Sequence, residues 1–193
     1  IEITVLPRPE VNMNLSTTQG CGAVTVSGDV SATDSYLYVW SFMPEPAFQV
    51  GMQLDPITFT SSGNHPIAVA VTGINGCQSS AQQFVTVHPE PAADFAFEGA
   101  CFGETTSFSD ESTSDFGTNI TGWYWQFGDG SVSYESNPTH DYSFTGDYNV
   151  SLTVTTPECS TSTSQFVGIN PNPTVEAQAD ILSAVSYTHL RAH

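Results

Sequence analysis

The chain has 193 residues, with 20 acidic side chains against two basic ones, Arg8 and Arg191, so its formal charge is −18 and it has no lysine. A chain this acidic cannot build the basic surface that nucleic acids or anionic membranes attract, so neither is an expected partner. No apolar run is long enough for a transmembrane helix, so no membrane insertion is expected. Hydrophobic residues make up 39% and aromatic residues 11% of the chain, which is sufficient for folded cores.

A repeat of about 82 residues organises the chain. The pattern aliphatic-x-Pro-x-Pro occurs three times, beginning its proline pair at Pro7, Pro89 and Pro171, which are 82 positions apart. Just before the second and third occurrences, Gln83-Phe84-Val85 corresponds to Gln165-Phe166-Val167, again at a spacing of 82. Proline lacks the N–H that a central strand needs, so the Pro-x-Pro pairs are suitable module boundaries.

We therefore expect two complete modules, at residues 7–88 and 89–170. Residues 1–6 are expected to be the last strand of a preceding module, and residues 171–193 to contain the start of a truncated third one. The last nine residues, 185–193, resemble a translated sequencing-adapter peptide and are expected to have no functional role.

Within each module the apolar residues alternate with a period of two. The alternation is clear in four segments: 36–42, 67–71, 123–127 and 148–154. This period is typical of strands with one buried face. Six or seven short strands in about 80 residues, separated by Gly, Asn, Asp, Ser and Pro, predict an all-β fold made of tandem β-sandwiches.

Each module has two cysteines at corresponding positions: Cys21 and Cys77 in the first, Cys101 and Cys159 in the second. Four cysteines allow three pairings. The repeat favours Cys21–Cys77 and Cys101–Cys159, because each module is expected to close on its own. Each bond would stabilise its module by about 4 kcal/mol in chain-entropy terms and would indicate an oxidising compartment. A zinc site is the alternative, although no Cys-x-x-Cys pair or suitably spaced histidine supports it.

Three blocks of the second module carry a family resemblance. They are Trp-Tyr-Trp-Gln-Phe-Gly-Asp-Gly at 123–130, Asn-Pro-Thr-His-Asp-Tyr at 137–142, and Gly-Asp-Tyr-Asn-Val-Ser-Leu-Thr-Val at 146–154. Together they resemble the PKD domain, an Ig-like fold common in bacterial secreted and surface proteins. The first module is a divergent relative: it keeps Trp40-Ser41-Phe42 and Gly63, but Met-Pro-Glu-Pro stands at 43–46 in place of Gly-Asp-Gly. The paired cysteines resemble those of tandem arrays on large cell-surface proteins.

These blocks have structural explanations. Asp129-Gly130 favours a tight hairpin, Trp125 and Phe127 are expected in the core, and Tyr148 is expected to make a tyrosine-corner-like contact. His140 is expected to bind the neighbouring turn. No catalytic residue is expected, since the chain lacks the nucleophile, metalloprotease and phosphate-loop motifs.

Calcium is the one ion that the sequence suggests. The segment 109–117 concentrates hard oxygen ligands before a strand, including Asp110 and Asp115, and Asp94 follows the Pro-x-Pro linker. Carboxylates and carbonyls suit Ca²⁺. The alternative is a solvated loop on an acidic protein, and no other cofactor is expected.

The resemblance implies a non-catalytic extracellular or cell-surface array, acting as a rigid spacer or interaction region. Its partners would be neighbouring modules and a protein or carbohydrate ligand. The alternative is an accessory region of a secreted protease or polysaccharidase whose catalytic domain lies elsewhere. Exposed rings would favour substrate binding: Tyr124 and Tyr134 are the candidates, whereas Trp123 and Trp125 are expected to be buried.

Overall fold

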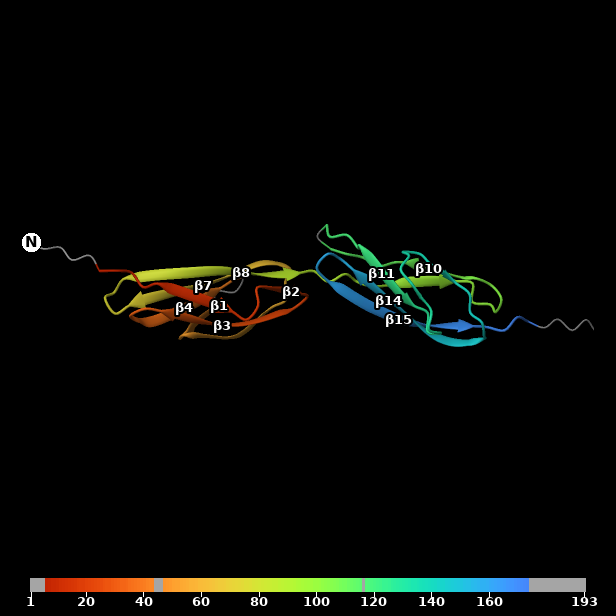
Figure 1. Ribbon diagram of the computed structural model, residues 1–193, viewed down its shortest axis with the longest axis horizontal. Helices are drawn as coiled ribbons and strands as arrows, with labels where there is room; N and C mark the ends of the chain where they lie inside the picture. The colour runs from red at the N-terminus through yellow and green to blue at the C-terminus, as the bar shows by residue number, and fades with distance from the viewer. Residues whose placement is uncertain (1–5, 44–46, 116, 174–193) are drawn as a thin grey trace, which may run out of the picture.

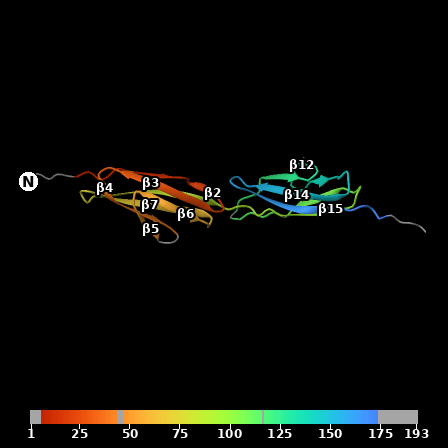
Figure 2. The same ribbon diagram turned by 90° about the horizontal axis from the view of Figure 1, so that it is seen from below.

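The computed structural model describes residues 6–43, 47–115 and 117–173, and in these ranges it contains strands, turns and loops but no helix. The all-β prediction is thus confirmed. Two β-sandwiches lie end to end along the long axis of the molecule, and the polypeptide passes once from one to the other (Figures 1 and 2). Most of the predicted strand at 1–6 and the tail at 174–193, including the adapter-like residues, lie outside the described ranges.

The first sandwich packs a three-stranded sheet, in the order β1-β3-β6, against a five-stranded sheet, in the order β2-β8-β7-β4-β5. Its strands are β1 (Val11–Leu15), β2 (Gln19–Cys21), β3 (Val24–Ala32), β4 (Ser35–Phe42), β5 (Ala47–Val50), β6 (Gln53–Phe59), β7 (Gly63–Gly73) and β8 (Gln78–His88). All pairs are antiparallel except β2 with β8, which is parallel.

The second sandwich packs the sheet β13-β10-β9 against the sheet β12-β11-β14-β15. Its strands are β9 (Phe95–Glu98), β10 (Thr106–Asp110), β11 (Gly122–Gln126), β12 (Val132–Ser133), β13 (Thr139–His140), β14 (Gly146–Thr155) and β15 (Ser160–Ile169). Here Cys101 pairs in parallel with Asn170 as an isolated bridge, at the place that the parallel strand β2 takes in the first sandwich.

Each sandwich has its own hydrophobic core, built by the period-two alternation. One cluster runs from Met13 to Val87 and the other from Phe95 to Ile169. Trp40 and Trp125 are fully buried, one in each cluster. Burial of these aromatic side chains, together with the valine, leucine and isoleucine side chains around them, stabilises each sandwich.

The repeated glutamines bond the first strand of each sandwich, β1 and β9. Gln83 Nε2 donates a hydrogen bond to the Met13 carbonyl at 2.9 Å, and Gln165 Nε2 donates one to the Phe95 carbonyl at 2.8 Å. Both bonds join the two sheets of a sandwich across 70 positions of sequence. The sequence repeat is therefore also a repeat of individual contacts.

The tyrosine-corner contact is confirmed and has a counterpart in the divergent module. Tyr148 Oη donates to the Phe144 carbonyl at 3.0 Å, four residues upstream. His65 occupies the corresponding position, two residues after Gly63, and its Nε2 lies 2.7 Å from the Ser61 carbonyl, also four residues upstream. Since a carbonyl only accepts, Nε2 carries the proton. An imidazole thus makes the backbone contact that a phenol makes in the second module.

The predicted disulfide pairing within each module is wrong. The bond joins Cys21 of the first sandwich to Cys159 of the second, while Cys77 and Cys101 are free thiols. Cys77 immediately precedes β8, and Cys21 lies opposite His88 at the other end of that strand. An 11-residue strand is about 36 Å long, whereas bonded cysteines have Cα atoms no more than about 7 Å apart. Cys21 and Cys77 therefore cannot meet.

The same geometry separates the cysteines of the second module. Cys159 precedes β15, and Cys101 lies beside Asn170, just beyond the far end of that strand. The repeat identified the corresponding cysteines correctly. The fold, however, places the two cysteines of each module at opposite ends of its sandwich. One end of each module then faces its neighbour, which is why the bond crosses the boundary.

Candidate functional site at the module junction

The first side of the junction is built where β8 ends. The short strand β2 runs parallel to β8 and places Cys21 opposite His88, the last residue before the linker. The Gly22 amide then donates to the His88 carbonyl at 2.9 Å. Cys21 is thus held at the exit of the first sandwich by the pairing of β2 with β8 and by the bond from the Gly22 amide that follows it.

The second side is the hairpin between β14 and β15. The Thr156 amide donates to the Cys159 carbonyl at 2.8 Å, and the Cys159 amide donates to Thr156 Oγ1 at 3.1 Å. Cys159 is buried, and its bond to Cys21 has a Cα–Cα separation of 5.9 Å, within the usual range for disulfides. The Cys21 sulfur also lies 3.3 Å from the Glu158 carbonyl oxygen.

The linker is anchored at both ends. At its start Gly22 has a positive φ of 65°, and a Cβ there would come within 2.8 Å of the Glu90 carboxylate. The positive φ is the reason for a glycine here, because the Glu90 carboxylate is the end of a flexible side chain and can move aside. At its end, Ala92 and Thr113 exchange two backbone hydrogen bonds of 2.8 and 2.9 Å. Covalent and hydrogen bonds together fix the connection between the sandwiches.

The Gly-Asp-Gly block forms the hairpin that its sequence predicts. The Ser131 amide donates to Asp129 Oδ1 at 2.9 Å, and His140 Nε2 lies 2.7 Å from Asp129 Oδ2. The His140 ring stacks on Phe127 with centroids 4.2 Å apart. The imidazole is thus bound to the turn, as predicted. It lies between a carboxylate and core aromatic rings.

The electrostatics of this cluster follow from its geometry. Burial acts to raise the pKa of Asp129, but the hydrogen bonds from Ser131 and His140 outweigh it and hold that pKa below its usual value. Burial, then the nearby charge of Asp129, raises the pKa of Tyr142 far above that of a free phenol. Tyr142 Oη donates to the Phe127 carbonyl at 3.1 Å. These groups stabilise one end of the core.

The acidic residues predicted for calcium have other contacts. Asp110 Oδ2 accepts from Trp123 Nε1 at 2.6 Å, and Asp110 Oδ1 accepts from the Ser112 amide at 3.0 Å. Asp94 Oδ1 accepts from the Phe95 amide at 2.9 Å. Ser112 also bonds the Asp94 backbone, which brings the Asp94 and Asp110 segments together, and Asp115 lies on the loop that follows.

Within residues 6–43, 47–115 and 117–173, no three His, Cys, Asp or Glu side chains converge on a point where they could hold a metal ion. Calcium binding at Asp94, Asp110 and Asp115 stays a prediction. It would depend on backbone carbonyls and water to complete the coordination.

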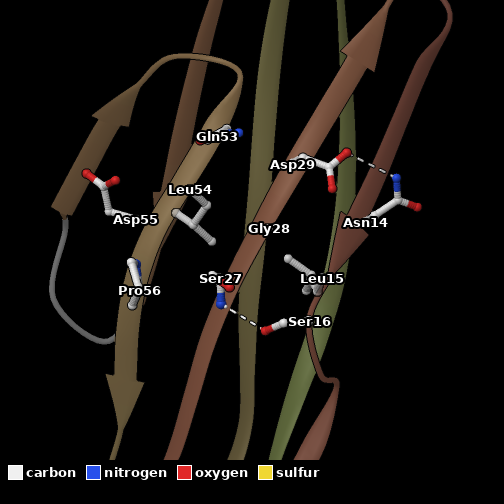
Figure 3. A pocket seen from close by; sticks show the side chains of 10 residues that line it. All are labelled: Asn14, Leu15, Ser16, Ser27, Gly28, Asp29, Gln53, Leu54, Asp55 and Pro56. Carbon is white, nitrogen blue, oxygen red and sulfur yellow. Dashed lines mark hydrogen bonds between the residues drawn. The ribbon is translucent and has the colours of Figure 1, made fainter.

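A hollow of about 430 Å³ opens over the sheet β1-β3-β6 of the first module (Figure 3). Its polar groups already bind one another: Asn14 Nδ2 donates to Asp29 Oδ2 at 3.3 Å, and the Ser27 amide donates to Ser16 Oγ at 3.0 Å. Asp55 lies across the hollow from Asp29 (Figure 3). None of the residues predicted from the sequence to be functional lines it.

Two tyrosines form an aromatic surface on the outer face of the second module. The rings of Tyr124 and Tyr134 lie 5.4 Å apart at an angle of 34°, and Tyr134 is 71% exposed. Trp125 is buried as expected, whereas Trp123 is only partly buried. Trp123 stays near the surface because its indole N–H bonds Asp110. Of the two tyrosines that the sequence suggested as exposed, Tyr134 is exposed and Tyr124 is half-buried beside it.

These features define a class: tandem Ig-like β-sandwiches joined by a fixed connection. The second of these sandwiches also matches a known protein family. Residues 87–169, which include the whole second sandwich, match the PKD domain family. PKD domains are non-catalytic modules.

Several bacterial proteins contain similar segments. A microbial collagenase of Vibrio alginolyticus is 37% identical over 94 residues, which cover 47% of this chain and 12% of the collagenase. Collagenase ColA of Clostridium perfringens is 34% identical over 95 residues, covering 49% of this chain and 8% of that protein. The chain thus spans only about a tenth of the length of these relatives.

Among solved structures, the PKD1 domain of the Vibrio cholerae metalloprotease PrtV is 30% identical, with a TM-score of 0.39, covering 42% of this chain and 98% of that domain. The PKD1 domain of Vibrio anguillarum Epp is 27% identical, with a TM-score of 0.40, covering 43% of this chain and 96% of that domain. No helix in the described part of the chain is long and apolar enough to cross a membrane.

Proposed function

We propose that the chain is part of a non-catalytic extracellular array in a bacterial surface or secreted protein, and that it holds neighbouring elements at a fixed spacing. The observation that carries this proposal is the bond between Cys21 and Cys159, which joins the two sandwiches beside an anchored linker. A flexible tether would need neither. A disulfide also indicates an oxidising compartment, which supports a location outside the cytoplasm.

The spacer function predicts a narrow range of distances between the outer ends of the molecule. Cys77 and Cys101 are free thiols at those two ends, so both accept a fluorophore without any engineered cysteine. Single-molecule energy transfer between them should give a narrow distribution in the native chain. It should give a broad one in the double variant Cys21→Ser/Cys159→Ser, which keeps both labelling sites. Equally broad distributions in the two proteins would contradict the spacer function.

The second candidate is an accessory region that binds the substrate of a secreted hydrolase. The adjacent rings of Tyr134, which is exposed, and Tyr124, which is half-buried, favour it, because paired rings supply a large, rigid contact area for a polymer. The relatives named as collagenases and a metalloprotease make an insoluble protein the first polymer to test.

Co-sedimentation with fibrous collagen and with cellulose separates the two candidates. If the accessory function holds, the chain pellets with one polymer, and Tyr124→Ala and Tyr134→Ala each reduce the bound fraction. Tyr36→Ala is the matched control, since Tyr36 is 63% exposed but lies on the first module. If the chain pellets with neither polymer, the accessory function is contradicted and the spacer function is the one that remains.

A further inference from the structure

The two free thiols stand at the outer ends of the pair of sandwiches. Cys77 precedes β8, so it lies at the end of the first module that faces away from the linker. Cys101 pairs with Asn170, so it lies at the opposite end of the molecule. Cys101 is exposed and Cys77 is half-buried. Two complete sandwiches separate them, so they cannot bond to each other within one chain.

Cys101 has the position in the second module that Cys21 has in the first. Cys21 pairs in parallel with His88, the residue before the linker prolines, and Cys101 pairs in parallel with Asn170, the residue before the next proline pair. The amide that follows each cysteine donates to that partner's carbonyl, at 2.9 Å in the first module and 2.8 Å in the second, where the donor is Phe102. We use half-site for the part of one module that contributes one cysteine to a bond between modules. The second module therefore ends in the same half-site as the first, the one that contributes Cys21 to the observed disulfide.

Cys77 has the position in the first module that Cys159 has in the second. Both close the hairpin between the last two strands: the Gly73 amide donates to the Cys77 carbonyl at 2.8 Å, as Thr156 does to Cys159. The cysteine amide is bonded by a side chain in each case, by Asn75 Oδ1 at 2.9 Å and by Thr156 Oγ1 at 3.1 Å. The first module therefore begins with the other half-site.

The surroundings of both free thiols suit contact with another module. Asn75 Nδ2 donates to the Pro7 carbonyl at 2.9 Å, which holds the Cys77 hairpin against the incoming Pro-x-Pro segment. Ile74 in that hairpin is 72% exposed, and Phe102 beside Cys101 is 39% exposed. An exposed apolar residue thus flanks each free thiol at the face where another module would dock.

We propose that Cys77 and Cys101 form disulfides with the neighbouring modules of the same polypeptide, so that every module boundary is crossed by one bond like that between Cys21 and Cys159. Cys101 would bond a hairpin cysteine about 138 residues further along the chain, and Cys77 a cysteine about 138 residues earlier, the separation of the observed pair. This inference rests on the proposed spacer array and specifies its partner, which is a second module of the same kind.

The bond-forming step needs an oxidant, which is a disulfide such as oxidised glutathione or the active-site disulfide of an export-compartment oxidoreductase. One cysteine thiolate attacks the oxidant disulfide and releases its first sulfur as a thiol, giving a mixed disulfide. The second cysteine thiolate then attacks this intermediate and releases the other sulfur. Two protein thiols have lost two electrons and two protons, and the oxidant has become two thiols.

The test duplicates residues 7–170 inside the full chain, so that residues 1–170 are followed directly by 7–193. The new join, Asn170 to Pro7, recreates the Pro-x-Pro connection, and Cys101 of the first copy precedes Cys77 of the second by 140 positions, against 138 for the observed pair. The protein is oxidised in a glutathione buffer, remaining thiols are alkylated, and peptides are mapped without reduction. We expect a peptide joining Cys101 of the first copy to Cys77 of the second.

The outcomes separate this inference from the spacer function. Alkylation of both Cys101 and Cys77 at the join, with both Cys21–Cys159 bonds intact, overturns the inference and leaves the spacer standing. Absence of the Cys21–Cys159 bonds overturns both. In the matched variant, Cys101→Ser in the first copy should leave Cys77 of the second copy alkylated; if that Cys77 instead bonds another cysteine, position does not specify the pairing and the inference fails.

A second measurement uses the unmodified length of the chain. Cys77→Ser and Cys101→Ser proteins are each oxidised alone and then as a mixture, and separated without reductant. The inference predicts covalent heterodimers in the mixture well in excess of the homodimers that either variant forms alone. Equal yields of homodimers and heterodimers would count against a head-to-tail fit between the two half-sites.

Discussion

At the scale of single residues, the second module depends on side chains that combine a charge with an aromatic contact. Asp129 accepts from the Ser131 amide and lies 2.7 Å from His140 Nε2, and His140 in turn stacks on Phe127. Trp123 combines a partly buried ring with a bond to Asp110. Such pairs substitute for the lysine and arginine salt bridges that this composition rules out, since Arg8 is the only Lys or Arg among the described residues.

The lowered pKa of Asp129 makes the second module sensitive to acid. A carboxylate whose pKa is lower in the folded than in the unfolded state contributes stability above the unfolded value, near pH 4, and that contribution disappears as the pH falls through the folded value. Asp129→Asn should therefore flatten the decrease of the free energy of unfolding below about pH 4. Urea titrations followed by tryptophan fluorescence measure it. Asp141→Asn is the control, and equal acid dependence in both variants would contradict the assignment.

At the scale of elements, the hairpin after β11 depends on two glycines for different reasons. Gly128 and Gly130 both have positive φ, at 85° and 98°. A Cβ on Gly128 would lie 2.9 Å from the Asn149 carbonyl oxygen, whereas a Cβ on Gly130 would meet nothing within 4 Å. The first glycine thus allows β14 to approach the turn, and the second supplies only the backbone conformation.

Alanine at these two glycines should have unequal costs. Gly130→Ala should destabilise the second module by about 1 kcal/mol, the cost of the left-handed conformation alone. Gly128→Ala adds a backbone collision and should cost roughly 1–3 kcal/mol more. Chemical denaturation of the two variants measures the difference. If Gly130→Ala proves as costly as Gly128→Ala, the contact with Asn149 is not the reason for the glycine.

The connection between β10 and β11 is the element on which calcium binding would depend. If Asp94, Asp110 and Asp115 bind Ca²⁺, millimolar calcium should raise the melting temperature above that in EDTA at matched ionic strength. Asp110→Asn should abolish the increase, while Asp55→Asn, on the first module, should leave it intact. An unchanged melting temperature in the native chain would exclude the site.

At the scale of the whole molecule, self-repulsion is the main electrostatic effect. A net charge of −18 with so few cations means that most acidic groups face other acidic groups. Adding monovalent salt should therefore raise the melting temperature of the chain, because screening weakens repulsion and has few attractive pairs to disrupt. Differential scanning calorimetry over increasing sodium chloride measures this, and a falling melting temperature would contradict it.

The sequence predicted the alternating strands, the buried Trp125 and Phe127, and the hairpin around Asp129, because each depends on local patterning or on a family motif. It did not predict the pairing of Cys21 with Cys159. The repeat shows which cysteines correspond, but the end of a sandwich on which each lies depends on β2 running parallel to β8, a non-local pairing with no pattern of its own. The length of β8 after Cys77 was the available signal, since it places 11 strand residues between that cysteine and the linker.

The bond between Cys21 and Cys159 also determines how the array would carry tension. A pull along the polypeptide passes from residue 21 directly to residue 159, so the 138-residue interval between them is excluded from the load path. That interval could otherwise extend to roughly 480 Å. Both hydrophobic cores lie mostly within it, so force reaches only the strands outside, chiefly β1, β2 and β15. While the bond is intact only the residues outside this interval can extend, and reduction would release the interval as well.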